Sequence, residues 1–188
     1  MLLRALAIWC GLLVVAFVNG AVRTIESLAL SGDRFPFAQH RQLLHNAGNG
    51  RFDDVSERAG PSFALADVGR GAAFGDIDND GDTDVIIANN NGPVRLFVNQ
   101  IGNRKHWVGL NGVAAGSRVE ILRPNQPPLV RRASTDGSYA SASDPRVLVG
   151  LGDSTEPPTV CVTWPDGRVE RRRIPIDRYT SLQEVARQ

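Results

Sequence analysis

The sequence predicts an all-β protein, and three of its features support this fold class. Short apolar runs recur along the chain and are separated by Gly, Asn, Asp and Pro, the residues that favour turns. The chain contains 19 glycines and 11 prolines among its 188 residues, as expected for many short strands joined by turns. After residue 30, no heptad repeat and no long apolar stripe at helical spacing is present.

The overall charge limits the classes of partner. The formal net charge is +1, from 21 basic and 20 acidic residues. A balance this close to zero argues against a basic nucleic-acid-binding protein, so we expect no nucleic-acid partner. The charge is uneven, because residues 1–100 carry 8 basic and 11 acidic residues and residues 101–188 carry 13 and 9. This shift predicts two modules with a boundary near residues 100–103.

The first 20 residues have two interpretations. Arg4 precedes a 14-residue apolar run, and the small residues Gly20 and Ala21 follow it, as at the cleavage site of a signal peptide. Alternatively, residues 11–20 form a buried strand that ends in an Asn-Gly turn. The apolar run is short for a membrane-spanning helix, which needs about 20 residues. An apolar segment of this kind could still attach the protein to a membrane or cell envelope.

The strongest chemical signal is an acidic segment, residues 76–84, hereafter the acidic loop. Acidic side chains occupy every odd position of its nine residues, and glycine stands at the sixth. Carboxylates this close repel one another unless a cation lies between them, and Ca²⁺ takes about six to eight oxygen ligands. Gly81 lets the chain turn sharply beneath the metal, where a Cβ would clash. The predicted calcium ligands are Asp76, Asp78, Asp80, Asp82 and Asp84.

The acidic loop differs from an EF-hand. An EF-hand requires a bidentate glutamate at position 12, where this chain has Ile87. The flanking runs, residues 72–74 and 85–88, are short and apolar and predict strands. We therefore predict a calcium loop between two strands, in which Asp82 contributes its main-chain carbonyl and the other four aspartates their side chains. Mg²⁺ fits less well because it retains more of its waters. The alternative is a solvated acidic turn without a metal.

Several segments of the first half resemble a known repeat. Residues 74–87 resemble the FG-GAP or VCBS repeat of β-propellers, and residues 95–99 resemble the outgoing strand of the same blade. Residues 44–56 are similar to the segment that precedes such a repeat in the cartilage acidic protein family. The resemblance implies a partial FG-GAP/VCBS propeller repeat over residues 21–103.

The second half, residues 104–188, resembles the ASPIC/UnbV domain, which implies a small β-sandwich-like domain after the repeat. A closed propeller takes about four to eight blades of four strands each, more than the preceding residues can supply. We therefore interpret the chain as a truncated member of the family, or as one whose open blade edges are covered by a partner chain. The matching segments are residues 106–108, 116–119, 137–139, 149–152 and 162–167.

Within the second half, residues 159–174 predict a β-hairpin. Residues 159–164 alternate between polar and apolar side chains, and Pro and Gly then stand at positions 165 and 167, as in a tight turn. Arg171 and Arg173 would share one face of the returning strand and Arg172 the other. We therefore expect a solvated edge strand here, rather than a compact patch for an anion or a nucleic acid.

The cysteines and aromatic residues are expected to be structural. Cys161 lies in the alternating segment and is predicted to be a small buried strand residue. With Cys10 as the only other cysteine, the chain lacks a disulfide framework and a thiolate metal site. Trp107, Tyr139 and Trp164 could stack on sugars, but we expect packing roles for them.

The predicted function is a calcium-binding β-repeat protein, secreted or held in the cell envelope, that binds or adheres to a protein or glycan. Millimolar calcium outside the cell suits the weak extracellular class of site. No enzyme activity and no catalytic residue are predicted, since the chain has no Gly-x-Ser-x-Gly segment. Two alternatives stay open: a carbohydrate- or ester-acting hydrolase with structural calcium, and a non-autonomous fragment of a larger propeller protein.

Overall fold

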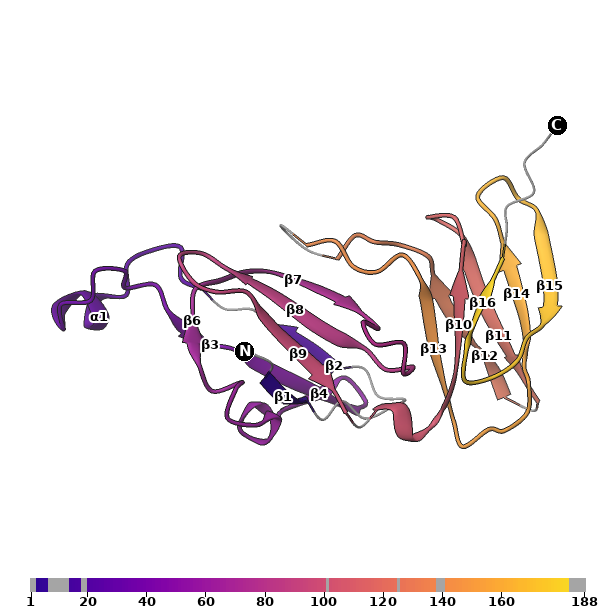
Figure 1. The fold of residues 1–188 in the computed structure, drawn as a ribbon, viewed down its shortest axis with the longest axis horizontal. Helices are drawn as coiled ribbons and strands as arrows, with labels where there is room; N and C mark the ends of the chain where they lie inside the picture. The colour runs from indigo at the N-terminus through magenta and orange to yellow at the C-terminus, as the bar shows by residue number, and fades with distance from the viewer. Residues whose placement is uncertain are drawn as a thin grey trace.

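The protein is built from short strands arranged in two modules that lie side by side along its longest axis (Figure 1). This arrangement confirms the predicted all-β class. The computed structural model describes residues 3–6, 14–17, 20–100, 102–124, 126–137 and 141–182. The described strands form five separate sheets, and no closed ring of blades is present among them.

A four-stranded sheet forms the centre of the N-terminal module. Its order is β1 (Leu3–Leu6), β9 (Arg95–Asn99), β8 (Asp84–Asn89) and β7 (Gly69–Gly75). The strands β7, β8 and β9 are antiparallel neighbours, so the chain runs as a meander through the predicted blade. β1 lies parallel to β9, a pairing that the sequence did not indicate.

Two smaller sheets complete this module. One contains β2 (Val14–Phe17), β4 (Gln42–Gly48) and β5 (Arg51–Asp54), and the other contains β3 (Gln39–His40) and β6 (Ala66–Asp67). β2 runs antiparallel to β4, as in the strand interpretation of the N-terminal segment. Two short helices, α1 (Glu26–Leu30) and the 3₁₀ helix η1 (Ser56–Ala59), connect the strands.

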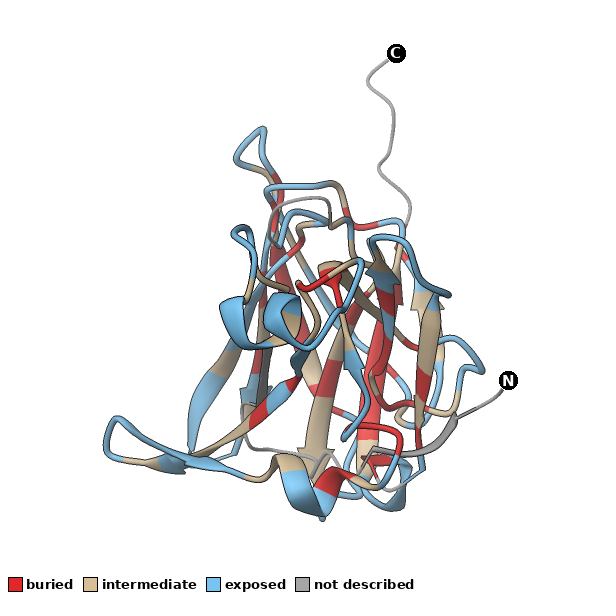
Figure 2. Cartoon of the chain, turned by 90° about the vertical axis from the view of Figure 1, so that its left-hand side faces the viewer, coloured by how far each residue is buried: buried red, intermediate tan, exposed pale blue. Residues whose placement is uncertain are grey.

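The N-terminal module has a small core of its own. Phe97, Leu43 and Ile87 are fully buried, and the ring of Phe63 packs edge-to-face on that of Phe97, with centroids 5.5 Å apart. Buried positions follow the strands, whereas α1 is exposed and contributes no buried residue (Figure 2). The acidic loop therefore extends from a sheet that is anchored by packed aromatic and aliphatic side chains.

The C-terminal module consists of two sheets around one core. Its strands are β10 (His106–Asn111), β11 (Arg118–Arg123), β12 (Gln126–Arg132), β13 (Val147–Gly152), β14 (Thr159–Thr163), β15 (Val169–Arg173) and β16 (Tyr179–Ser181). One sheet has the order β13-β10-β16 and the other β12-β11-β14-β15. Buried side chains from both sheets, such as Leu110, Val149, Ile121 and Val162, belong to the same cluster. This confirms the sandwich-like domain. A 3₁₀ helix, η2 (Gly102–Arg104), links the two modules.

The predicted hairpin is present in this module. β14 pairs antiparallel with β15, and the turn is closed by the N–H of Gly167, which donates to the carbonyl of Trp164 over 2.9 Å. β15 is an outer strand, and all three arginines at positions 171–173 are exposed. The prediction of a solvated edge strand is therefore confirmed.

The packing roles predicted for the aromatic and cysteine residues are also confirmed where the structure describes them. Trp107, Trp164 and Cys161 are 6%, 2% and 5% exposed. Tyr139 and Cys10 lie outside the described residues. Within the described part of the chain, no helix has both the length and the apolar character needed to span a membrane.

Candidate metal centre

The acidic loop connects β7 to β8 at one end of the central sheet. Gly75, the last residue of β7, pairs with Asp84, the first residue of β8, so Asp76 and Asp84 are brought close together at the base of the loop. Both residues are buried, at 2% and 1% exposure. The predicted arrangement of an acidic loop between two strands is therefore present.

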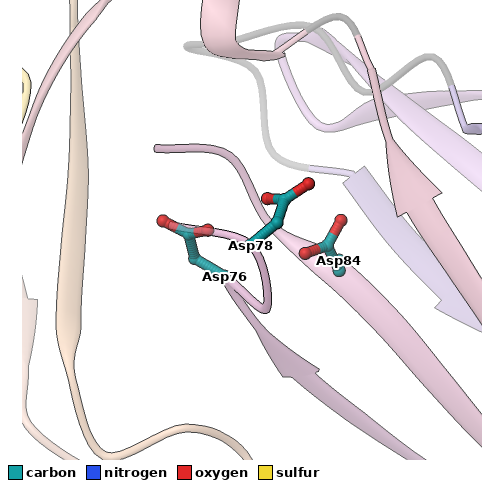
Figure 3. A group of neighbouring side chains, drawn as sticks. All are labelled: Asp76, Asp78 and Asp84. Carbon is teal, nitrogen blue, oxygen red and sulfur yellow. The ribbon is translucent and has the colours of Figure 1, made fainter. Parts of the chain in front are cut away.

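Three of the predicted ligands converge. One carboxylate oxygen each from Asp76, Asp78 and Asp84 lies within 4.8 Å of the other two (Figure 3). Asp78 is exposed, whereas the other two are buried, so solvent reaches the cluster at Asp78. These side chains belong to the four that were expected to bind calcium directly.

Backbone N–H groups hold two of these carboxylates in place. Asp76 accepts from the N–H groups of Asp80, over 3.1 Å, and Gly81, over 2.9 Å. Asp84 accepts from Ile77 and Asn99, each over 2.8 Å. A carboxylate oxygen that accepts one such bond keeps a lone pair for a cation. The same bonds fix the course of the loop, so its fold orients the candidate ligands.

Asp80 and Asp82 are bonded to Asn103 of η2 instead of joining the three-carboxylate cluster. The side chain of Asn103 donates to Asp80 over 2.5 Å, and its backbone N–H donates to Oδ2 of Asp82 over 3.2 Å. The other oxygen of Asp82, Oδ1, is buried and has no hydrogen-bond partner among the described residues. Asp82 was expected to act through its main chain, but the structure shows a side-chain oxygen available as well.

The electrostatics of the loop favour a bound cation. Burial, followed by the charges of Asp80 and Asp84, raises the pKa of Asp82 to about 7. Burial is also the main cause that raises the pKa of Asp84 and of Asp78 above the ordinary value. Carboxylates that lose hydration and face like charges are costly to ionise, and a divalent cation among them removes that cost. The donor set is made of hard oxygen atoms, which fits Ca²⁺.

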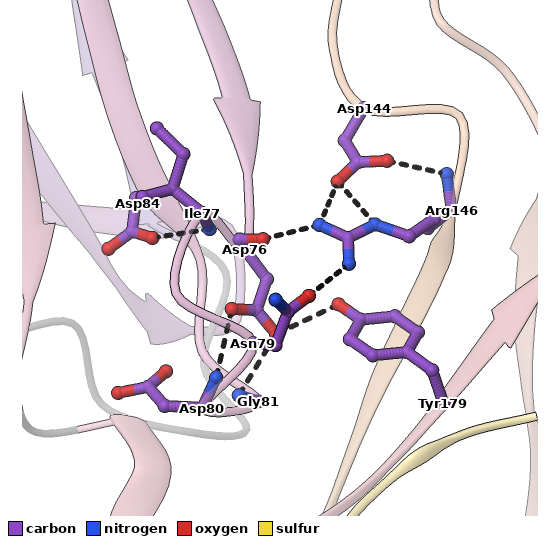
Figure 4. A network of polar contacts seen from close by, with 9 residues as sticks. All are labelled: Asp76, Ile77, Asn79, Asp80, Gly81, Asp84, Asp144, Arg146 and Tyr179. Carbon is purple, nitrogen blue, oxygen red and sulfur yellow. Dashed lines mark hydrogen bonds and ion pairs between the residues drawn. The ribbon is translucent and has the colours of Figure 1, made fainter.

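The C-terminal module reaches into the loop, which the sequence did not indicate. The hydroxyl of Tyr179 donates to Oδ2 of Asp76 over 2.8 Å. Arg146 donates to the main-chain carbonyl of Asp76 and, over 2.5 Å, to Oδ1 of Asn79 (Figure 4). Asp144 in turn holds Arg146 through its side chain. These residues stand about 70 and 100 positions from the loop, so no local pattern could identify them.

A hollow of about 340 Å³ lies beside the loop, between the two modules. Its lining includes the apolar side chains of Phe74, Ile77 and Ile86 and the polar side chains of Asn79, Asp144 and Arg146. Ile77 and Ile86 are 56% and 40% exposed, so apolar surface is present next to the candidate metal centre.

Comparison with known proteins identifies both modules. Residues 37–87, which include β7, the acidic loop and most of β8, match the family model of the FG-GAP-like repeat. Residues 108–188 match the model described as ASPIC and UnbV. The first module is therefore similar to an FG-GAP-like repeat and the second to an ASPIC and UnbV domain, and each match covers part of the chain. The resemblance inferred from the sequence is therefore confirmed.

Curated relatives are similar in sequence to part of this chain. Cartilage acidic protein 1 from Mus musculus and from Homo sapiens is 26% identical to it over 144 residues, and that from Xenopus tropicalis is 26% identical over 145. The match covers 71% of this chain and 22% of each relative. The chain thus spans about a fifth of the length of these relatives.

Proposed function

We propose that the chain is a calcium-binding module in which Ca²⁺ fixes the acidic loop of the FG-GAP-like repeat. The observation that supports this proposal best is the convergence of Asp76, Asp78 and Asp84, in a loop that also holds the unpartnered, buried oxygen of Asp82. A buried carboxylate oxygen without a hydrogen-bond donor is costly, and a cation would satisfy it. Calcium here is structural, since it would tie β7 to β8.

The proposed role of the calcium-loaded chain is binding or adhesion to a protein or glycan, and not catalysis. Carboxylates that hold a divalent cation stay ionised, which makes them poor proton donors and acceptors. The hollow with the exposed side chains of Ile77 and Ile86 gives a partner apolar surface beside the metal. Extracellular calcium sites bind in the range of about 10⁻⁴–10⁻³ M, which suits a secreted or envelope protein.

Calcium titration of the full chain tests this proposal. Thermal unfolding in EDTA and in increasing Ca²⁺ should give a transition that rises with calcium. At a ligand concentration 100 times the dissociation constant, native-state binding stabilises by about 2.7 kcal/mol. The same series in Mg²⁺ should give a smaller rise, because fewer of its waters are displaced.

Two variants make the test specific. Asp78→Asn removes an exposed carboxylate of the cluster and should weaken calcium binding by more than about 10-fold, the lower bound for changes in the surroundings of metal ligands. Asp53→Asn removes an exposed aspartate on β5, outside the loop, and should bind calcium as the parent does. A parent transition that is insensitive to about 10 mM Ca²⁺, well above the range of extracellular sites, would refute the proposal. The absence of any cooperative transition would support the fragment alternative.

A further inference from the structure

The ASPIC and UnbV domain covers the free edge of the repeat. Among the described strands, β7 is an outer one of its sheet, and none of them pairs with its outward N–H and C=O groups. Residues 141–146, hereafter the docking segment, lie along this edge. The N–H of Ala72 donates to the hydroxyl of Ser141 over 3.0 Å, and that of Phe74 donates to the hydroxyl of Ser143 over 3.3 Å. The N–H of Asp144 donates back to the carbonyl of Phe74 over 2.8 Å.

The same segment continues into the acidic loop. Arg146 follows the edge contacts directly and donates to the carbonyl of Asp76 and to Asn79. Its guanidinium carbon lies 4.3 Å from the ring centroid of Tyr179, whose hydroxyl bonds to Asp76. Asp76, the first candidate ligand, is therefore held at its main chain and at its side chain by groups of the other module (Figure 4).

We propose that Tyr179 and Arg146 are positioning residues of the calcium site, so that calcium binding and docking of the ASPIC and UnbV domain on the repeat stabilise each other. This inference rests on the proposed function, because it needs the acidic loop to bind calcium. Hydrogen bonds to metal ligands commonly contribute about 10- to 100-fold to metal affinity by orienting the ligand. Coupling between two binding events is reciprocal, so calcium must in turn tighten the docking.

The positive charge of Arg146 should repel a calcium ion in the loop only weakly. The guanidinium is paired with Asp144, and the remaining contacts to the loop go to the main-chain carbonyl of Asp76 and the amide of Asn79. Partial burial of Asp144 acts to raise its pKa, but the hydrogen bonds and the charge of Arg146 together outweigh it and hold this pKa below its ordinary value. Replacing Arg146 by lysine keeps the positive charge but removes the planar guanidinium group with its several N–H donors. The Arg146→Lys variant therefore separates the positioning effect of Arg146 from its charge.

Isothermal titration of the full chain with CaCl₂ tests the proposal. Tyr179→Phe removes only the hydroxyl, and Arg146→Lys keeps the charge but cannot reach both loop acceptors in the same geometry. Each variant should bind calcium about 10-fold more weakly than the parent. The matched control is Arg168→Lys. Arg168 bonds to Asp166, two residues before it, and lies over the ring of Trp164. Arg146 has the same surroundings, since it bonds to Asp144 and lies over the ring of Tyr179. Arg168, however, stands in the turn between β14 and β15, away from the acidic loop.

The unfolding temperature in EDTA separates positioning from a general structural effect. A residue that only stabilises the fold lowers the transition equally in EDTA and in calcium and leaves the dissociation constant unchanged. A positioning residue reduces the shift that calcium produces. Parent-like dissociation constants for Tyr179→Phe and Arg146→Lys, in a parent that binds calcium, would overturn the inference alone. A parent that binds no calcium would overturn the proposed function and, with it, this inference.

Hydrogen exchange gives the reciprocal measurement. Calcium should slow exchange of the Asp144 amide, which is bonded to Phe74 across the two modules, and leave the Gly167 amide in the distant turn unchanged. In Tyr179→Phe the calcium-dependent protection of Asp144 should shrink. Equal exchange of the Asp144 amide with and without bound calcium would contradict the coupling.

Discussion

The indole ring of Trp107 lies directly against Gly81, so that no side-chain atom fits at position 81. A Cβ built on Gly81 would overlap the ring, and its φ of +92° is in the region that favours glycine. Trp107 is the second residue of β10, in the C-terminal module, and is 6% exposed. The sequence explained Gly81 by the sharp turn of the loop, and the structure adds the close approach of the second module.

Gly81→Ala should destabilise the chain by about 3 kcal/mol, from about 1–2 kcal/mol of backbone strain and a similar cost of displacing the indole ring. Gly167→Ala is the matched control, because its φ is +85° and no heavy atom lies within 4 Å of the added Cβ. Urea unfolding of both variants measures the difference. Equal losses of stability would show that the ring of Trp107 does not restrict position 81.

Asp82→Asn should have opposite effects with and without calcium. In EDTA at pH 8 the variant should be more stable than the parent, because it removes a buried carboxylate with one unpartnered oxygen next to Asp80 and Asp84. The amide oxygen of the new side chain can still accept from the backbone N–H of Asn103. In calcium the variant should be less stable than the parent, because it lacks a charged oxygen of the calcium-binding loop. Thermal unfolding in both buffers tests this, and a variant less stable than the parent in EDTA would contradict it.

The acid sensitivity of the chain should depend on Asp67. Its carboxylate pairs with Arg41, whose side chain is 1% exposed, and with Arg95 over 3.0 Å. Burial opposes ionisation of Asp67, but the hydrogen bonds and charges of Arg95 and Arg41 hold its pKa below the ordinary 3.8. A carboxyl whose pKa is lower in the folded state stabilises the fold above pH 3.8, and this contribution disappears as the pH falls below that value.

Asp67→Asn should therefore cost about 3 kcal/mol at pH 7, because it leaves Arg41 buried without its counter-charge. The difference from the parent should narrow at about pH 2.5, because the parent carboxylate gains protons as the pH falls below the ordinary pKa of 3.8. Asp166→Asn removes an exposed Asp–Arg pair, with side chains 32% and 35% exposed, and should cost less than about 1 kcal/mol at either pH. Urea unfolding at the two pH values gives these numbers. An undiminished difference at low pH would show that the ion pair is not its source.

The parts of the molecule that could be predicted are those encoded locally. The alternating aspartates, Gly81 and the apolar runs on either side were enough to place a loop between β7 and β8, because strand and turn preferences act over a few residues. The 159–174 hairpin was predictable for the same reason. The all-β class followed from the density of turn-forming residues.

The remaining features depend on contacts between distant parts of the chain. Tyr179 bonds to Asp76 across 103 positions, and Arg146 reaches the loop across 70. Neither residue stands in a motif, and their roles arise only when the two modules dock. Asn103, which organises Asp80 and Asp82, lies in the predicted boundary between modules, where no chemical role was expected. The parallel pairing of β1 with β9 likewise has no local signal.

The double variant Ser141→Ala, Ser143→Ala should expose the edge of β7. Each serine hydroxyl accepts a backbone N–H of β7, so its loss should cost about 1 kcal/mol, or about 2 kcal/mol for the pair. An uncovered edge strand presents free N–H and C=O groups to other chains, so the variant should also self-associate more strongly than the parent. Sedimentation velocity over a concentration series measures the association, and urea unfolding measures the stability. The control is Ser134→Ala, a half-buried serine whose hydroxyl donates to the nearby Asp136 carbonyl over 3.5 Å and not to β7 among the described residues. If the double variant matched this control in both measurements, the docking segment would not be what covers the edge of the blade.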